Sequence, residues 1–500
     1  MKNTPPKRAV MQDGSGKSPA RRRAVDGGDQ EGRQGKDWDL DFCTIPFQDR
    51  YILYRPRRHL AFIGNQALVD HVRNRRAGRP GPAHPEADRF LASAGFWAAD
   101  LECTPLPPAE DIRPTQAVLL MTNHCNLRCV YCYANAGAES RSVQMPWPVA
   151  QAVIDTMLAN ARRPGAASPA LTFHGGGEPT VHWETLVRAT QYAKNGDART
   201  RVSMSSNGVW SDRQRKFICQ HFDNVSLSMD GIAPVQDRQR PRRNGGGSYQ
   251  AVMESIAALD EAGIDYGIRM TVLPDVVGHL AEGVRLICEK TRARAIQIEP
   301  TFTSSRGQYA DITGEFADAF ADRFLEAWKL ARSAGRHIYY SGARPWVIAP
   351  MFCMAPLQAM VATADGRLVT CFEVFSEQSP MAGLFTVGRV SGGRVTYDRA
   401  ALRRFVAAQQ RRREACRDCF CYWHCCGDCA TRRPDGHAAT QGRCRATRKI
   451  TLGLLLDYIE EGGGVWQGLR EQRLVSAEVC SGESGPAATP ATDARKKPAP

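Results

Sequence analysis

Short apolar runs alternate with longer amphipathic runs along the middle of the chain. Six strand-like runs occupy residues 117–123, 170–176, 201–208, 224–231, 266–273 and 295–302. Each is followed by a run with helical spacing of its apolar residues, at 147–161, 183–193, 212–222, 249–263, 278–290 and 314–335. Strands that alternate with helices form a parallel sheet with the helices outside it. Six units are too few for the closed eight-fold barrel, so the pattern predicts an α/β fold with a partial, TIM-like (β/α)6 barrel over residues 113–340.

The segment before this barrel has a different pattern. Residues 50–74 read as two short strands joined near Pro56 and followed by a helix, and residues 87–101 add a second helical piece. We therefore expect a small α+β unit over residues 39–112. Its edge strand could accept an extended peptide by backbone pairing, which would make it a peptide-recognition module. A plain structural cap on the barrel explains the same pattern equally well.

The remaining segments are poor in long apolar runs. Residues 341–462 are rich in loops and cysteines, and this pattern predicts a domain held together by bound metal. Residues 1–38 form a Gly-, Pro- and Arg-rich stretch that we expect to be a disordered basic tail, and residues 463–500 should be a mostly disordered C-terminal tail.

Composition narrows the class of protein. The chain is 43% hydrophobic and 24% charged, as globular proteins are, and no run approaches the ~20 apolar residues that span a bilayer. The N-terminus has no apolar signal core, so we expect a cytoplasmic protein without membrane contact. Part of the net charge of +14 lies in residues 1–36, with nine Lys and Arg against four Asp and Glu. A solubilising tail is the favoured interpretation over a nucleic-acid or acidic-peptide contact.

Seventeen cysteines in a reducing compartment favour metal over disulfides. Three of them, Cys125, Cys129 and Cys132, are spaced C-x3-C-x2-C directly after the first predicted strand. A structural zinc site needs a fourth protein ligand, and His124 would strain to reach the same centre as its neighbour Cys125. An iron–sulfur cluster held by three cysteines leaves one iron open for another ligand.

The stretch "CNLRCVYC", which includes Tyr131, resembles the signature of the radical S-adenosylmethionine (SAM) superfamily. The resemblance implies that Cys125, Cys129 and Cys132 hold a catalytic 4Fe–4S cluster. SAM would chelate its fourth iron and be cleaved reductively to a 5′-deoxyadenosyl radical. The resemblance implies further SAM contacts at the later strand ends. Gly176, Gly177 and Glu178 match the family's GGEP turn, and Ser206 and Asn207 match a Ser-Asn pair near the SAM ribose. Ser228 and Arg240 match a Ser and an Arg at the SAM carboxylate, and Ile298 matches a residue near the adenine.

The later cysteines resemble the SPASM extension of these enzymes, which carries two auxiliary 4Fe–4S clusters. The resemblance assigns Cys416, Cys419, Cys425 and Cys444 to one cluster, and Cys353, Cys371 and Cys429 to a second whose fourth ligand stays open. Zinc ribbons remain an alternative on spacing alone. Cys421 and Cys426 fall outside the spacing and are taken as buried bystanders.

The resemblance implies an oxidoreductase that abstracts hydrogen from a precursor peptide or protein during maturation of a ribosomally made peptide (RiPP). An electron donor such as flavodoxin or ferredoxin would be its partner. Relatives that mature sulfatases have an Asp directly after the cysteine equivalent to Cys371, whereas this chain has Phe372 and then Glu373. That departure disfavours a sulfatase-maturating enzyme. A radical SAM enzyme acting on RNA or a small molecule and a non-enzymatic zinc-ribbon protein that binds nucleic acid are further alternatives.

Overall fold

A large open sheet organises the protein. The computed structural model describes residues 40–136, 143–301, 313–379, 381–431 and 441–468. Within them, eleven strands pair in the order β10-β9-β8-β7-β6-β5-β4-β11-β12-β13-β14. The run from β4 to β10 is parallel throughout, and it consists of β4 (Gln116–Leu120), β5 (Ala170–His174), β6 (Arg201–Ser206), β7 (Asn224–Ser228), β8 (Asp265–Val272), β9 (Ala295–Pro300) and β10 (His337–Tyr339). The six predicted strands are β4 to β9, so the partial barrel is confirmed, and β10 adds a seventh strand that the pattern did not predict.

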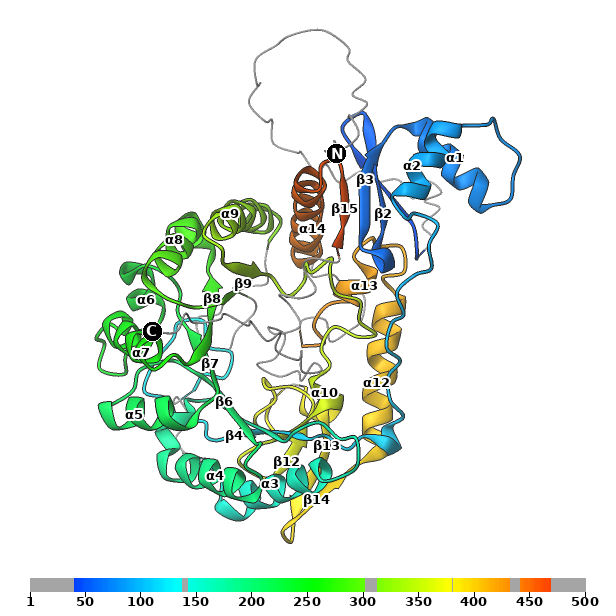
Figure 1. Cartoon of the computed structure of the whole chain (residues 1–500). Coiled ribbons are helices and arrows are strands. Elements are labelled where there is room, and N and C mark those ends of the chain that lie inside the picture. Colours follow the sequence, from blue (N-terminus) through cyan, green and yellow to red (C-terminus); the bar gives the residue numbers. More distant parts are fainter. Residues whose placement is uncertain (1–39, 137–142, 302–312, 380, 432–440, 469–500) are drawn as a thin grey trace, which may run out of the picture. The chain divides into compact units, whose positions relative to one another are not determined.

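The helices that connect these strands lie along the outer side of the curved sheet, as Figure 1 shows. They are α3 (Trp147–Ala161), α4 (Trp183–Gly196), α5 (Asp212–His221), α6 (Ala233–Gln239), α7 (Tyr249–Ala262), α8 (Leu280–Lys290) and α9 (Gly314–Ser333). Their ends follow from local sequence. Ser211 and Gln214 form a capping box at the start of α5. Gly263, at φ 68°, ends α7 in a left-handed conformation that costs glycine little.

The alternation of side chains along β8 shows which face of the sheet is covered by helices. Met270 reaches toward α8, where its Cε would be 3.4 Å from a Cβ added at Gly283, and the Tyr266 hydroxyl donates a hydrogen bond to Asp260 of α7. Both residues therefore face the helices. Because successive side chains in a strand point to opposite sides, Arg269 and Thr271 face the other way. We call that side of the sheet the inner face.

The segment that we expected to be loop-rich also extends the sheet. β11 (Ala359–Ala362) pairs in parallel with β4, and β12 (Arg367–Val369), β13 (Thr386–Ser391) and β14 (Arg394–Tyr397) follow in antiparallel order. The helices here are α10 (Ala355–Gln358), α11 (Ala382–Phe385), α12 (Arg399–Glu414), α13 (Tyr422–Cys425) and α14 (Gln441–Glu461). Phe385, Leu402, Phe405 and Leu454 belong to the same hydrophobic core as the barrel strands. These elements therefore pack on the core of the barrel.

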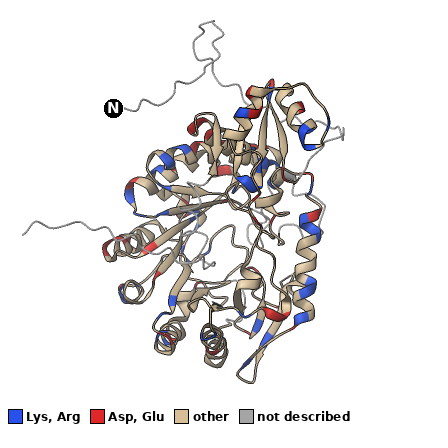
Figure 2. Ribbon diagram, turned by 45° about the vertical axis from the view of Figure 1, so that its right-hand side comes forward, with Lys and Arg blue, Asp and Glu red and all other residues tan. Residues whose placement is uncertain are grey.

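Charge is concentrated on one of these helices. Exposed Arg403, Arg404 and Arg411 give α12 a basic surface, which Figure 2 shows in blue. Basic residues are thus not confined to residues 1–38. Those residues and Cys480 lie outside the described part of the chain. Among the helices that are described, none is both long and apolar enough to cross a membrane.

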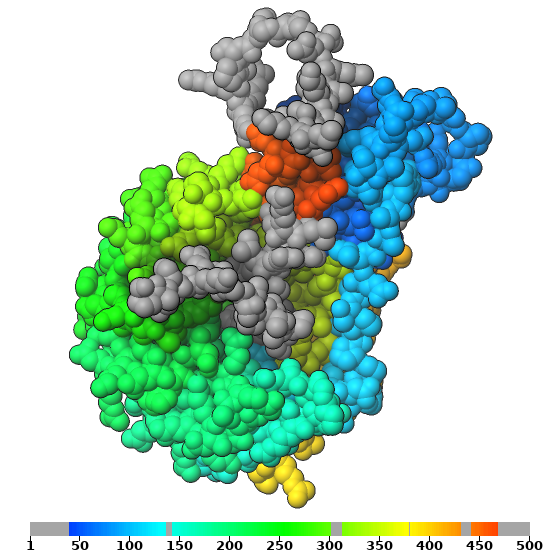
Figure 3. Space-filling view, viewed as in Figure 1, coloured from blue at the N-terminus to red at the C-terminus, as the bar shows by residue number. Residues whose placement is uncertain are grey.

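The N-terminal unit is a second, antiparallel sheet in the order β1-β2-β3-β15. β1 (Cys43–Phe47) was not predicted, whereas β2 (Arg50–Arg55) and β3 (Leu60–Gly64) are the expected strands joined by the turn Pro56–Arg58. α1 (Gln66–Arg76) and α2 (Pro85–Ser93) follow. The fourth strand, β15 (Val465–Gln467), comes from the segment that we expected to be a loose C-terminal tail. Figure 3 shows α14 and β15, in orange and red, beside the blue N-terminal segment.

One tryptophan explains why β15 is ordered. Trp466 is only 4% exposed, its ring stacks on Tyr458 of α14 with centroids 5.3 Å apart, and it lies 6.0 Å from the ring of His59. Burying an indole contributes several kcal/mol, which offsets the entropy of ordering a three-residue strand.

We predict that Trp466→Ala detaches β15 from β3. Loss of a buried tryptophan costs about 3–5 kcal/mol, so the β3 amides should exchange with solvent much faster while those of β6 remain protected. Hydrogen–deuterium exchange measures both strands in one experiment. Gln467→Ala, which changes an exposed side chain of the same strand, is the matched control. Unchanged exchange of β3 in the Trp466 variant would contradict the assignment of β15 as a stabilising strand.

Candidate functional site

The loop after β4 brings three thiols together. The pKa of Cys125 is raised to about 12, first by burial and then by the neighbouring Cys129, Glu178 and Cys132. Backbone N–H groups point at the sulfurs, with Leu127 N donating to Cys125 Sγ at 3.4 Å and Ala136 N donating to Cys132 Sγ at 3.5 Å. Neighbouring thiols that accept N–H bonds suit iron–sulfur ligation.

The chain after α6 fixes this loop in place. Arg128 N donates to Pro241 O at 2.7 Å, Val130 N to Gln239 O at 2.9 Å, and Arg243 N to Asn126 O at 3.1 Å. These bonds run on both sides of Cys129. The thiols are therefore held by backbone that belongs to a distant part of the sequence.

The glycine turn after β5 has a structural reason that differs from the expected one. A Cβ at Gly177 would overlap the backbone of His124, and a Cβ at Gly176 would overlap the Phe375 ring. The glycines thus allow close approach by the cysteine loop and by the C-terminal segment. A ligand is not needed to explain them.

Glu178 joins this turn to the end of β6. Its Oε1 accepts from Thr180 N, Thr180 Oγ1 and Ser206 Oγ, and its Oε2 accepts from Asn207 N at 2.8 Å. Asn207 Nδ2 in turn donates to Asn126 Oδ1 at 2.7 Å and lies 3.8 Å from Cys125 Sγ. Burial raises the pKa of Glu178 in spite of its four donors. The structure therefore brings Glu178, Ser206 and Asn207 against the first cysteine.

A second polar network surrounds Arg240, which is 7% exposed. Arg240 NH1 donates to the Tyr131 hydroxyl at 2.6 Å, and that hydroxyl donates to Asp230 Oδ2 at 2.7 Å. Burial alone would lower the pKa of Arg240, but the nearby Cys129, Tyr131 and Asp230 hold it well above its usual value. Its Nε is buried and has no hydrogen-bond partner among the described residues. A buried cation with an unused donor beside a thiol can bind a carboxylate.

Ser228 and Ile298 lie on opposite sides of the sheet. Ser228 is paired in register with Arg269, so its side chain is on the inner face. Ile298 is paired with Met270, faces the helices and is fully buried in the core. The structure thus does not bring Ile298 to the inner face, where the expected adenine contact would need it.

The C-terminal cysteines also form neighbouring groups. Burial raises the pKa of Cys371 well above its usual value, and the next contributions come from Glu373, Cys429 and Cys353. For Cys425, burial and Asp428 are followed by Cys419 and Cys444. Cys416 lies one turn before Cys419, whose N–H donates to its carbonyl. These groupings follow the two ligand sets expected from sequence. Among the described residues, no group of three or more His, Cys, Asp or Glu side chains is arranged to hold a single metal ion.

Cys421 and Cys426 are buried between these groups. Cys421 Sγ donates to Thr451 Oγ1 at 3.6 Å, and Cys426 Sγ donates to Ala349 O at 3.2 Å. Their thiols thus have partners in the surrounding protein, as expected of structural residues.

Sequence reasoning missed a buried ion pair that ties the cysteine segments together. Arg443 donates from Nε and NH2 to the two carboxylate oxygens of Asp428 at 2.8 and 2.9 Å, and both side chains are 4% exposed. Asp428 has φ 68°, which non-glycine residues rarely adopt. The available signal was that Asp428 precedes Cys429 and Arg443 precedes Cys444.

Sequence reasoning also missed a contact between the barrel and the segment after β12. His174 stacks on Phe372 with centroids 4.8 Å apart, and the Tyr133 hydroxyl donates to Gly175 O at 3.3 Å. Burial, and then the charge of Arg269, lower the pKa of His174 to about 4, so its ring is neutral. Glu373 N donates to Cys371 Sγ at 3.5 Å. The residues around the first cysteine group and those around the second therefore form one surface, which we call the shared wall.

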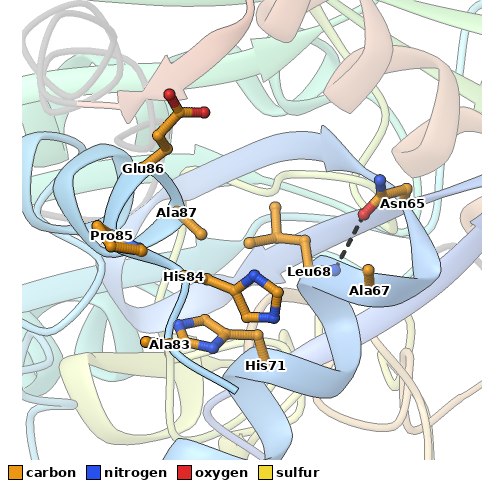
Figure 4. Close-up of a pocket in the computed structure, with 9 residues that line it drawn as sticks. All are labelled: Asn65, Ala67, Leu68, His71, Ala83, His84, Pro85, Glu86 and Ala87. Carbon is orange, nitrogen blue, oxygen red and sulfur yellow. Dashed lines mark hydrogen bonds between the residues drawn. The ribbon is translucent and has the colours of Figure 1, made fainter. Parts of the chain in front are cut away.

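A pocket of about 410 Å³ lies apart from these cysteines, in the N-terminal unit. Figure 4 shows it between the starts of α1 and α2, where the rings of His71 and His84 meet edge to face with centroids 5.0 Å apart. His71 Nε2 is 2.9 Å from Asp88 Oδ1. Leu68 and Pro85 give the pocket an apolar part.

Comparison with known proteins places this site in a family. Residues 119–286 match the Radical SAM superfamily. The chain is 30% identical over 166 residues to the Fe-coproporphyrin III synthase of Methanosarcina barkeri, and 29% identical over 164 residues to the sporulation killing factor maturation protein SkfB of Bacillus subtilis. These matches cover 33% and 32% of this chain but only 38% and 36% of the relatives. The structure of native anSMEcpe with bound AdoMet has the same fold, with a TM-score of 0.55 and 17% identity over 70% of this chain and 99% of that chain.

We predict that Arg443→Met lowers the iron and acid-labile sulfide content by about one cluster. Removing one partner of a buried pair leaves an uncompensated charge that costs about 3–5 kcal/mol, here beside Cys429 and Cys444. Anaerobic reconstitution followed by iron and sulfide analysis measures the loss. Asp418→Asn, which changes an exposed acid in the same cysteine segment, should leave the content unchanged. Full iron content in the Arg443 variant would show that the pair does not hold the segment.

Proposed function

We propose that the chain is a radical SAM enzyme, because residues 119–286 match that superfamily, and that it modifies a peptide or protein by hydrogen abstraction. One observation carries the proposal: three neighbouring thiols lie between two buried polar networks at the ends of parallel strands. In parallel α/β sheets this edge is where substrates and cofactors bind.

The residues of the site fit the family's cofactors. Cys125, Cys129 and Cys132 would hold a 4Fe–4S cluster, since thiolates are its usual ligands. The free Nε of Arg240 fits the carboxylate of SAM, and Glu178 Oε2 has room to accept from the SAM amino group. When bound, the cluster and SAM supply a 5′-deoxyadenosyl radical.

The protein's own groups would orient these partners. Asp230 accepts from Tyr131, from Gln239 Nε2 at 2.7 Å and from Thr271 N at 3.0 Å, so it fixes the hydroxyl to which Arg240 donates. Asn207 connects Glu178 to the Cys125 loop. Preorganised donors of this kind cost no rearrangement when the ligand binds.

The C-terminal cysteines would hold two auxiliary clusters. Cys416, Cys419, Cys425 and Cys444 supply four thiols for one of them, and Cys353, Cys371 and Cys429 supply three for the other. A SPASM-type extension of this kind would take up the electron left on the substrate after hydrogen abstraction or would orient the substrate. A donor such as flavodoxin or ferredoxin would supply the electron for SAM cleavage.

Two observations support a peptide as the substrate. SkfB, one of the relatives, is by name a maturation protein for a sporulation killing factor. The N-terminal unit adds a sheet with a pocket beside it, outside the residues that match the superfamily. A sulfatase-maturating activity is disfavoured because Phe372, which stands where those enzymes have an Asp, stacks on His174.

A tetrapyrrole is the second candidate substrate. The likeness to Fe-coproporphyrin III synthase, 30% identical over 166 residues, favours it specifically. On the peptide proposal the N-terminal unit, which lies outside the residues that match the superfamily, would take part in binding, and on the tetrapyrrole proposal it would not. Substitutions in the pocket of Figure 4 that abolish turnover of a peptide would therefore favour the peptide over the tetrapyrrole.

We predict that Cys125→Ala abolishes cleavage of SAM. Wild-type protein, reconstituted anaerobically with iron and sulfide, should form 5′-deoxyadenosine when dithionite and SAM are added, as chromatography can measure. The variant lacks one of three cluster ligands, so its rate should fall to background. Cys219→Ala, in a half-buried thiol on α5, is the matched control and should retain full activity. Colourless protein with stoichiometric zinc would reject the proposal in favour of a zinc-ribbon protein.

We predict that Arg240→Gln weakens SAM binding by about ten- to a hundredfold. The guanidinium offers a charge-assisted bond to the SAM carboxylate, and a neutral amide offers only an ordinary one. Titration of the oxidised cluster with SAM, followed by isothermal titration calorimetry, gives the dissociation constant without turnover. Arg238→Gln, on the same helix but exposed and paired with Asp275, should bind SAM normally. Equal affinity in the two variants would remove Arg240 from the SAM site.

A further inference from the structure

An exposed arginine stands in the middle of the parallel sheet. Arg269 lies on β8, the strand between β7 and β9, and it faces the inner side. Its strand neighbours on that face are Ser228 and Gln297, to which it is paired in register. Among the described residues, the guanidinium has neither a hydrogen-bond nor an ion-pair partner. Barrel interiors are usually filled by side chains that pack against one another, so an exposed, unpaired arginine there is available to bind a ligand.

The surroundings of Arg269 lie between the two cysteine groups. Its charge lowers the pKa of His174, and it opposes the burial and the Glu373 charge that raise the pKa of Tyr133. Tyr133 follows Cys132 directly, and Glu373 lies two residues after Cys371. Arg269 therefore reaches the wall shared by both groups.

His174 supplies a second donor on the same wall. Its Nδ1 accepts from Gly175 N at 2.9 Å, so the proton of the neutral ring is on Nε2. The ring is held flat against Phe372. A neutral N–H donor near an unpaired guanidinium suits an acceptor group with two oxygens.

The group that Arg269 binds differs from the carboxylate of SAM. Arg240 is buried, donates to Tyr131 and lies by Cys129, whereas Arg269 is exposed and lies by Tyr133 and His174. Each arginine is thus near a different part of the cysteine loop. One fits the cofactor, and the other remains for the substrate.

We propose that Arg269 binds a carboxylate of the peptide substrate, either an acidic side chain or the C-terminal carboxylate. The inference rests on the proposed function, because it names what enters the same site. A substrate that fills the inner face removes water from Arg269, and a desolvated cation needs an anion. A carboxylate matches the guanidinium through two parallel hydrogen bonds. Glu373, whose negative charge acts on the same His174 and Tyr133, disfavours the higher charge of a phosphate.

Small probes test the inference on the anaerobic holoenzyme with SAM. N-acetylglutamic acid α-amide presents a side-chain carboxylate, N-acetylglycine presents a terminal one, and N-acetylglutamine amide is the neutral control. Saturation-transfer NMR titration should show at least one carboxylate probe binding about tenfold or more tightly than the neutral probe. Arg269→Gln should remove that difference, and Arg269→Lys should retain part of it. Arg294→Gln, in an exposed residue paired with Asp265 at the other end of the strands, should have no effect.

The outcomes separate this inference from the proposed function. Preference for the glutamic or the glycine probe identifies the source of the carboxylate. Equal binding of all three probes, a preference that survives in Arg269→Gln, or binding of inorganic phosphate or coproporphyrin III alone would overturn the inference. Formation of 5′-deoxyadenosine without peptide should be the same in wild type and Arg294→Gln. If wild type forms none, the proposed function fails instead.

Discussion

Three half-buried thiols held side by side repel one another once they lose their protons. Burial, Cys129, Glu178 and Cys132 together raise the pKa of Cys125 to about 12, so the folded loop holds a site that only a cation can make favourable as thiolate. The surrounding backbone supplies that geometry. The chain at the end of α6 and just after it bonds to both sides of Cys129, and Gly177 lets His124 approach closely. The folded protein thus holds the thiols together, at a cost in free energy, before any cluster binds. The other groups of the site are arranged around these mutually repelling thiolates.

Buried arginines distribute positive charge at the places where thiolates would gather. Arg240 lies by Cys129, and Arg443 lies one residue from Cys444. They differ in how they are compensated. Arg443 is fully paired with Asp428 and so has a structural role, whereas Arg240 keeps an unused Nε and so can take a ligand. Pairing, more than burial, therefore distinguishes an arginine that holds the protein together from one that binds.

The sequence predicted the features that repeat and missed those that depend on a single contact. β4 to β9 could be predicted because six alternations of apolar strand and amphipathic helix leave few other folds. β10 and β15 span three residues each, too short for a period, and β15 depends on where Trp466 meets Tyr458. The ligand sets of the cysteines were expected from the family resemblance. The side of the sheet on which Ile298 lies depends on the register of β9 with β8, which spacing does not reveal. The pair of Asp428 and Arg443 joins positions fifteen residues apart through folding alone.

The N-terminal sheet restricts how a peptide could be recognised there. An extended peptide would add to an open sheet edge, yet β3 is already paired on both sides, with β2 and with β15 from this same chain. The two edges within the described residues are the three-residue β15, which pairs with β3 alone, and β1, which pairs with β2 alone. That strand carries Pro46, which has no backbone N–H to donate and so weakens pairing along part of the edge. The pocket between α1 and α2 has no such obstacle, and its paired histidines beside Leu68 offer both polar and apolar contact. If the unit binds a peptide, side-chain insertion into this pocket is better supported by the structure than strand addition to β3.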